Sequence, residues 1–107
     1  MIDNGLILIV DDTPTNLEVL SETLYDAGFE VAIALDGESA LAQVQVGDFD
    51  LILLDVMMPG IDGFETCRRL KVNSVSNHIP VIFMTALSDN ESKIKALEIG
   101  AVDYITK

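Results

Sequence analysis

The stretch LILLDVMMPGIDG at residues 51–63 runs from four aliphatic side chains directly into Asp55 and then into a turn rich in glycine and proline. Near-continuous apolarity over so few residues is typical of a parallel strand that is buried on both faces. Pro59 fixes one φ angle, and the glycines allow backbone conformations that other residues resist. The stretch therefore predicts a central strand whose carboxyl end carries an acidic side chain in a shaped loop.

Similar apolar runs occur at residues 6–10, 81–84 and 102–105, the last interrupted by Asp103. Residues 30–34 are weaker and more alternating, which favours an edge strand. Helical patterns fill the intervals. The helices are predicted to start at Thr13 with Pro14, at Asp36, and at a capping box of Ser88 and Glu91. They are predicted to stop at Gly28, Gly47 and Gly100. Their apolar positions include Leu17, Leu20, Leu24, Ala40, Leu41, Val44, Phe64, Cys67, Leu70, Ile94 and Leu97.

Strands that alternate with helices at this spacing predict right-handed crossovers and a doubly wound α/β fold, with the functional site in the loops at the carboxyl ends of the strands. A chain of 107 residues is enough for one such domain. We therefore expect residues 1–107 to form a single domain.

Composition excludes several classes of function. The formal charge of -12, with only six Lys and Arg, argues against direct binding of nucleic acid. Cys67 is the only cysteine, so no disulfide framework can form, which fits a reducing cytoplasm. The apolar run at 6–10 is too short for a membrane span and lacks the basic flank of a signal peptide. We expect a cytoplasmic chain, with His78 in a surface loop.

Polar side chains follow four of the predicted strands. Asp11 and Asp12 come after the first, Asp55 after the third, Thr85 after the fourth and Lys107 after the fifth. Parallel strands bring these positions to one edge of the sheet. Three adjacent carboxylates repel one another unless a cation neutralises them, and Mg²⁺ prefers such oxygen ligands. Calcium is less expected, since no stretch matches an EF-hand loop.

A carboxylate beside such an ion can act as a nucleophile toward phosphorus and form an aspartyl phosphate. Thr85 could then donate a hydrogen bond to a phosphoryl oxygen, and the ammonium of Lys107 could supply a counter-charge.

These stretches resemble the signatures of the response regulator receiver family, and the similarity runs over the whole chain. The stretches are Val10–Asp12, Leu54–Gly63, Met84–Ala86 and Gly100–Lys107. The resemblance implies a five-stranded parallel sheet of flavodoxin-like order 2-1-3-4-5. It also implies a switch in two-component signalling that catalyses its own phosphorylation and dephosphorylation, rather than an enzyme.

The resemblance further implies a role for each site residue. Asp55 would be the phosphoacceptor, and Asp12 and Asp55 would bind Mg²⁺, with Mn²⁺ as an alternative ion. The Met57 backbone carbonyl would join them, and Asp11 would act largely through metal-bound water. Thr85 and Lys107 would hold the phosphoryl group, Ala86 would leave room for it, and Tyr104 would change rotamer with Thr85.

The resemblance also implies the partners. The phosphoryl donor would be the phosphohistidine of a histidine kinase or phosphotransfer protein, or a small acyl phosphate. The switch would control an output domain or a downstream protein.

Other interpretations stay open. Taken singly, Asp11 and Asp12 could cap a helix, Lys107 could be a surface charge, and Tyr104 a half-buried core aromatic. A haloacid-dehalogenase-type phosphatase would need a second acidic group where Met57 stands. A flavodoxin-like cofactor site would need a phosphate-binding loop after the first strand, where two carboxylates would repel phosphate. A phosphorylation-independent docking module, or pseudo-receiver, is the main alternative.

Two further expectations concern missing features. Relatives normally continue past the position of Lys107 with a proline and a final helix, which this sequence lacks. We expect uncovered apolar sheet surface and hence reduced stability or association into homo-oligomers. Met57 and Leu87 are apolar where polar residues can orient water, so we expect slow hydrolysis of the phosphoryl group.

Overall fold

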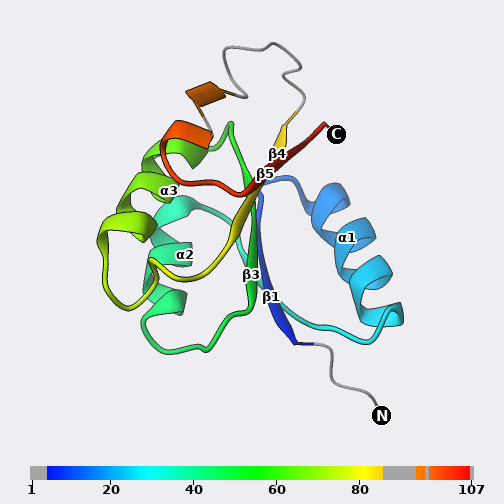
Figure 1. The fold of residues 1–107 in the computed structure, drawn as a ribbon. Coiled ribbons are helices and arrows are strands. Elements are labelled where there is room, and N and C mark those ends of the chain that lie inside the picture. The colour runs from blue at the N-terminus through cyan, green and yellow to red at the C-terminus, as the bar shows by residue number, and fades with distance from the viewer. Residues whose placement is uncertain (1–4, 86–93, 96, 107) are drawn as a thin grey trace.

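The computed structural model describes residues 5–85, 94–95 and 97–106 (Figure 1). Its five strands are β1 (Leu6–Val10), β2 (Glu30–Ala34), β3 (Leu51–Asp55), β4 (Val81–Thr85) and β5 (Asp103–Thr106). All pairings are parallel, and the order is β2-β1-β3-β4-β5. The predicted doubly wound sheet is therefore confirmed, with the alternating strand β2 at an edge. Asp55 and Thr85 are the last residues of their strands, not the first of the loops.

Three helices are bounded in the described residues: α1 (Pro14–Asp26), α2 (Gly37–Val44) and α3 (Gly63–Val72). Pro14 opens α1 as predicted, although the Thr13 side chain makes no capping hydrogen bond. The Asp36 carboxylate caps α2 by accepting from the Ser39 amide at 2.7 Å. Asp62 caps α3 in the same way, accepting from the Glu65 amide at 2.8 Å. These caps satisfy backbone donors that the first helical turn leaves open.

The two faces of the sheet carry separate cores, because successive strand residues point to opposite sides. On one side, α1 packs Leu17, Leu20 and Leu24 against the strands. On the other, α2 and α3 cover the sheet (Figure 1). The strand residues of the first core are Ile7, Ile9, Leu53 and Met84, and those of the second are Leu8, Val10, Ala34, Ile52, Leu54, Val81 and Phe83.

Parts of the predicted fourth helix are described. Residues 94–95 and 97–98 are helical, while the predicted capping box of Ser88 and Glu91 lies outside the described residues. Ile94 and Leu97 are each 55% exposed, so neither is buried as the spacing suggested. The buried apolar side chain that follows this helix is that of Ala101, which lies in the core shared with α2 and α3.

Ile105 is a residue at which the predicted uncovered sheet surface can be examined. It pairs in register with Met84, so both side chains point to the α1 side of the sheet, yet Ile105 is 49% exposed. Reduced stability and self-association stay predictions.

Candidate functional site

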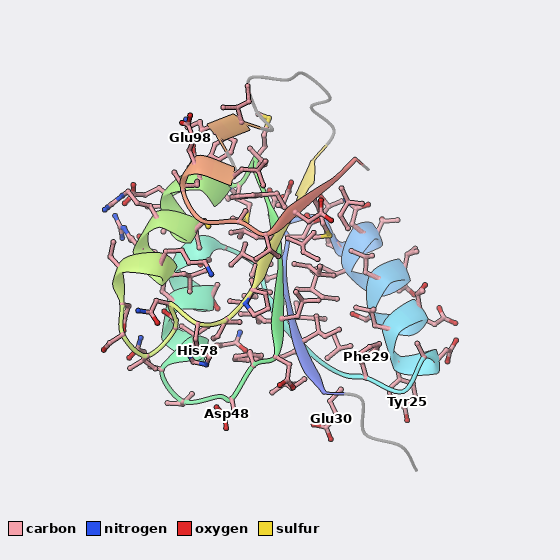
Figure 2. All side chains as sticks on the ribbon, in the orientation of Figure 1. Tyr25, Phe29, Glu30, Asp48, His78 and Glu98 are labelled. Atoms are coloured by element: carbon pink, nitrogen blue, oxygen red, sulfur yellow. The ribbon has the colours of Figure 1, made fainter. Side chains whose placement is uncertain are left out.

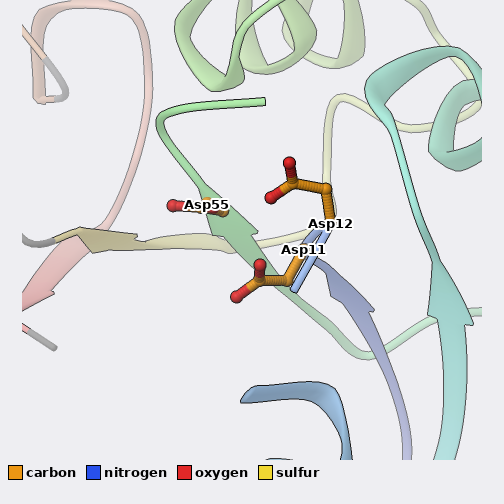
Figure 3. Close-up of side chains that lie close together, drawn as sticks. All are labelled: Asp11, Asp12 and Asp55. Carbon is orange, nitrogen blue, oxygen red and sulfur yellow. The ribbon is translucent and has the colours of Figure 1, made fainter. Parts of the chain in front are cut away.

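Three aspartates meet at the carboxyl ends of the neighbouring strands β1 and β3. One ligand oxygen each from Asp11, Asp12 and Asp55 lies within 4.8 Å of the others (Figure 3). The register explains the meeting of Asp11 and Asp55, since Val10 pairs with Leu54 and the residue after each is an aspartate, Asp11 just beyond β1 and Asp55 at the end of β3. The predicted convergence of chain-distant carboxylates is thus found.

The three carboxylates differ in their access to solvent. Asp11 is fully buried and Asp55 is 5% exposed, whereas Asp12 is exposed. Burying ionised carboxylates is costly unless other groups compensate the charge. Asp12 therefore forms the open side of the cluster, and Asp11 its buried floor.

Hydrogen bonds from two residues at the start of α1 orient the Asp11 carboxylate. Its Oδ1 accepts from the Thr13 amide at 2.9 Å, and its Oδ2 accepts from Asn16 Nδ2 at 3.3 Å. Its own amide donates to the Ala34 carbonyl of β2 at 3.1 Å. Both carboxylate oxygens are thus engaged within the protein, which suits an indirect role in ion binding. Asn16 was not predicted from the sequence, where its only signal is its place in the first turn after Asp11.

The alternative that Asp11 and Asp12 merely cap a helix is only partly supported. Thr13, not an aspartate, occupies the N-cap position of α1. Asp11 does accept from a backbone amide beside that helix. The cap interpretation does not account for Asp55, which reaches the same cluster from β3.

Asp55 is positioned by a close approach of α3 to the end of β3. The Gly63 amide donates to the Val56 carbonyl at 2.8 Å, and the Val56 amide donates to the Met84 carbonyl at 3.3 Å. A Cβ at position 63 would overlap the Asp55 carbonyl oxygen and lie 2.8 Å from the Val56 Cα. Gly63 is therefore required for space, whereas the sequence pattern predicted a role in turn conformation. Gly60 does fit that assignment, with φ of +76°.

A cavity of about 450 Å³ opens beside the cluster. Its wall combines apolar and charged side chains, and Lys95 Nζ lies 4.5 Å from the centre of the Phe64 ring. Lys95 was not predicted to belong to the site. The lining residues are Asp12, Val56, Met57, Met58, Asp62, Phe64 and Lys95.

The remaining predicted site residues are described only in part. The backbone of Thr85 ends β4 and pairs with Thr106, so it lies at the same edge as the aspartates; Tyr104 pairs with Phe83. The side chains of Thr85 and Tyr104, and all of Ala86, Leu87 and Lys107, lie outside the described residues. Their predicted roles stay predictions.

His78 and Cys67 lie apart from the cluster. His78 is exposed in the segment before β4, as predicted. Cys67 is buried on α3, and its burial raises the pKa of the thiol to about 11. A thiol with so high a pKa is a poor nucleophile near neutral pH.

The chemistry of the donor set fits Mg²⁺. Carboxylate oxygens are the ligands that this hard ion prefers, and it typically uses one or two of them and keeps several waters. Exposed Asp12 and buried Asp55 can supply such ligands. The Met57 carbonyl lies two residues after Asp55, and its part in ion binding stays a prediction.

Comparison with known proteins identifies relatives over nearly the whole chain. The sequence model of the family described as response regulator receiver domain matches residues 7–107. Response regulator PleD of Caulobacter vibrioides is 48% identical over 101 residues, which are 94% of this chain but 22% of PleD. The chain spans less than half the length of the curated relatives that it matches most strongly.

Solved structures agree with this assignment. The chemotaxis response regulator CheY4 of Vibrio cholerae has a TM-score of 0.92 and 36% identity, covering 96% of this chain and 86% of that one. Response regulator TrrA of Thermotoga maritima, in complex with Mg²⁺ and BeF, has a TM-score of 0.85 and 35% identity, with the same coverages. Among the residues that our structure describes, no helix has the length and apolarity that a membrane span needs.

Proposed function

Because the chain belongs to the response regulator receiver domain family of two-component systems, we propose that it is a magnesium-dependent phosphoacceptor switch whose acceptor is the carboxylate of Asp55. The observation that carries this proposal is the cluster of Asp11, Asp12 and Asp55 at the carboxyl ends of β1 and β3. The TrrA structure, which holds Mg²⁺ and BeF, supports the choice of ion for this chain.

In the proposed reaction, a carboxylate oxygen of Asp55 attacks the phosphorus of the donor. The new P–O bond forms as the P–N bond of a phosphohistidine, or the P–O bond of an acyl phosphate, breaks. The leaving imidazole takes up a proton, whereas an acyl phosphate releases a carboxylate. Hydrolysis reverses the modification, since water attacks phosphorus, inorganic phosphate leaves, and Asp55 regains its carboxylate.

A bound Mg²⁺ would neutralise negative charge on the phosphoryl oxygens and on the carboxylates. Asp12 and Asp55 would hold it with the Met57 carbonyl, and Mn²⁺ is an alternative ion. Asp11, whose two oxygens accept from Thr13 and Asn16, would act through water. Without a cation, an incoming phosphoryl group would meet three carboxylates, so we expect little reaction.

The side chains that would hold the phosphoryl group come from β4 and from the residue after β5. The Thr85 hydroxyl would donate to a phosphoryl oxygen, and Lys107 would supply the counter-charge. Tyr104 would follow the movement of Thr85 and transmit it to the protein surface. The strand pairing that places Thr85 at the edge of the aspartates supports this assignment.

The partners follow from the family. We propose a histidine kinase or phosphotransfer protein as donor, and an output domain or downstream protein as receiver of the signal. The low content of Lys and Arg favours protein partners over nucleic acid, and the cytoplasm is the proposed location. The chain acts on its own aspartate, so it is a switch rather than an enzyme that turns over a separate substrate.

The experiment measures intact mass after incubation with acetyl phosphate, with and without Mg²⁺. We expect one phosphoryl adduct that requires the ion and is lost in Asp55→Asn. Asp48→Asn is the matched control, because Asp48 is an exposed aspartate outside the cluster. A folded protein that forms no adduct would instead support the phosphorylation-independent docking module.

A further inference from the structure

A groove of about 720 Å³ lies between α1 and the edge strand β2. Leu6 and Glu30, the first residues of β1 and β2, line one end of it. The aspartate cluster lies at the opposite, carboxyl ends of the strands, so the groove is a separate feature. Figure 2 labels Tyr25 and Glu30 on this side of the molecule. The full lining is Leu6, Glu18, Ser21, Glu22, Tyr25, Glu30, Val31 and Ile33.

The floor of the groove is apolar and accessible. Tyr25 is 71% exposed and Ile33 is 44% exposed, while Val31 and Leu6 are partly buried beside them. Val31 and Ile33 point to the same side of β2, the side on which α1 packs. Neighbouring exposed side chains of this kind offer apolar contact area to a partner.

Three glutamates surround this floor, and none has an ion-pair partner in the part of the chain that the structure describes. The salt bridges found there join Glu65 to Arg68 and Arg69 on α3. The sequence explains the imbalance, because all six Lys and Arg residues lie at or after Arg68. Both elements that form the groove therefore lack basic side chains altogether. The three glutamates are Glu18, Glu22 and Glu30.

The wall also contains a polar atom that has no hydrogen-bond partner among the described residues. Ser21 Oγ is buried and makes no hydrogen bond to any described residue. Because Ser21 belongs to the lining, a polar group of an occupant that reached this hydroxyl would give it the partner that it lacks. Apolar contact, negative charge and an unused hydroxyl thus occur together.

We propose that this groove is a docking site for a basic amphipathic segment of a partner protein, with Lys or Arg beside aliphatic or aromatic side chains. The apolar side chains of the segment would cover Tyr25, Val31 and Ile33, and its cations would pair with the glutamates. A second copy of this chain would fit less well, because its α1 and β2 carry the same negative charge and the arginines on its α3 are already paired with Glu65.

The site would bind weakly and depend on salt. We expect a dissociation constant on the order of 100 µM, because the contact area is small and exposed charges are screened. Raising the salt from about 0.05 M to about 0.5 M should weaken binding several-fold, as the Debye length shrinks well below 10 Å. The apolar contacts should leave residual binding at high salt.

The test uses a synthetic helical peptide of leucine and lysine, with a peptide of leucine and glutamate as its counterpart. The amide NMR signals of the labelled chain are followed during titration with each peptide. We expect the lysine peptide to shift signals of α1 and β2 around Tyr25 and Ile33, and the glutamate peptide to shift none. Shifts centred on Asp12 and Asp55, or no binding at millimolar peptide, would overturn the proposal.

Matched variants separate the contribution of the groove to peptide binding from that of the overall negative charge of the chain. The first combines Glu18→Gln, Glu22→Gln and Glu30→Gln, and the control combines Glu38→Gln, Asp48→Asn and Glu98→Gln, three exposed acids elsewhere. Figure 2 labels Asp48 and Glu98 away from the groove. Both triple variants remove the same charge. The groove variant should lose at least about tenfold in affinity, and the control less than about twofold. Equal losses would mean that the peptide binds by overall charge alone, and the proposal would be wrong.

Discussion

Gly63, the first residue of α3, contacts the backbone of Asp55 so closely that no side chain fits between them. The relationship couples the start of a helix to the proposed phosphoacceptor, since the Gly63 amide also donates to the carbonyl of Val56. The loop between Asp55 and Gly63 is therefore held at both ends. Changes at position 63 should reach the site without touching any of its carboxylates.

Gly63→Ala should destabilise the fold by about 1–3 kcal/mol, because the added methyl forces the helix away from β3. It should also slow phosphorylation. Denaturant unfolding and the rate of adduct formation measure the two effects. Gly60→Ala is the control: a Cβ there meets nothing within 4 Å, so only its positive φ should cost about 1 kcal/mol. A Gly63→Ala protein as stable and reactive as the native chain would refute the close contact.

Asn16→Ala should weaken Mg²⁺ binding roughly tenfold, because outer groups that orient a metal-site carboxylate typically matter to this extent. The variant loses the hydrogen bond from Asn16 Nδ2 to Asp11. Calorimetric titration with Mg²⁺ measures the change. Thr15→Ala, an exposed change in the same helical turn, should leave the affinity as it is. If both variants bind equally well, Asn16 does not position Asp11.

Met57→Asn should speed the loss of the phosphoryl group roughly tenfold, since a polar side chain there could orient the attacking water. Met57 is 67% exposed and lines the cavity beside Asp12, so the substitution should not disturb the core. The decay of the adduct is followed by intact mass. Met57→Leu keeps an apolar side chain and should decay at the native rate. Equal rates for all three proteins would remove the proposed reason for slow hydrolysis.

Cys67 should react very slowly with iodoacetamide in the folded protein. Burial disfavours the charged thiolate and raises the pKa of the thiol to about 11. At about pH 8 only ~0.1% would be thiolate. Alkylation of the native chain should thus increase steeply as the pH rises toward 11. Unfolding should restore the rate of an ordinary cysteine, and rapid alkylation without unfolding would contradict the burial.

The sequence was sufficient to predict the strands and the convergence of the aspartates. The order of the strands was predicted from the resemblance to the receiver family. Buried parallel strands leave strong apolar runs, and the acidic residues follow them directly. Asn16 and the spatial role of Gly63 could not be predicted, because each depends on a contact between elements. For Ile94 and Leu97 the prediction from the sequence was wrong, because their helical spacing suggested burial and both are largely exposed. Periodicity predicts the apolar side of a helix, not how closely it packs.

The most direct test of the central claim identifies the modified residue. The chain is phosphorylated with acetyl phosphate and Mg²⁺, and borohydride then reduces the acyl phosphate, which converts the modified aspartate to homoserine. Peptide mass mapping locates the change. We predict homoserine at position 55 and at no other aspartate. Homoserine at Asp11 or Asp12, or a phosphoryl group that survives on another side chain, would contradict the assignment of Asp55 as the phosphoacceptor.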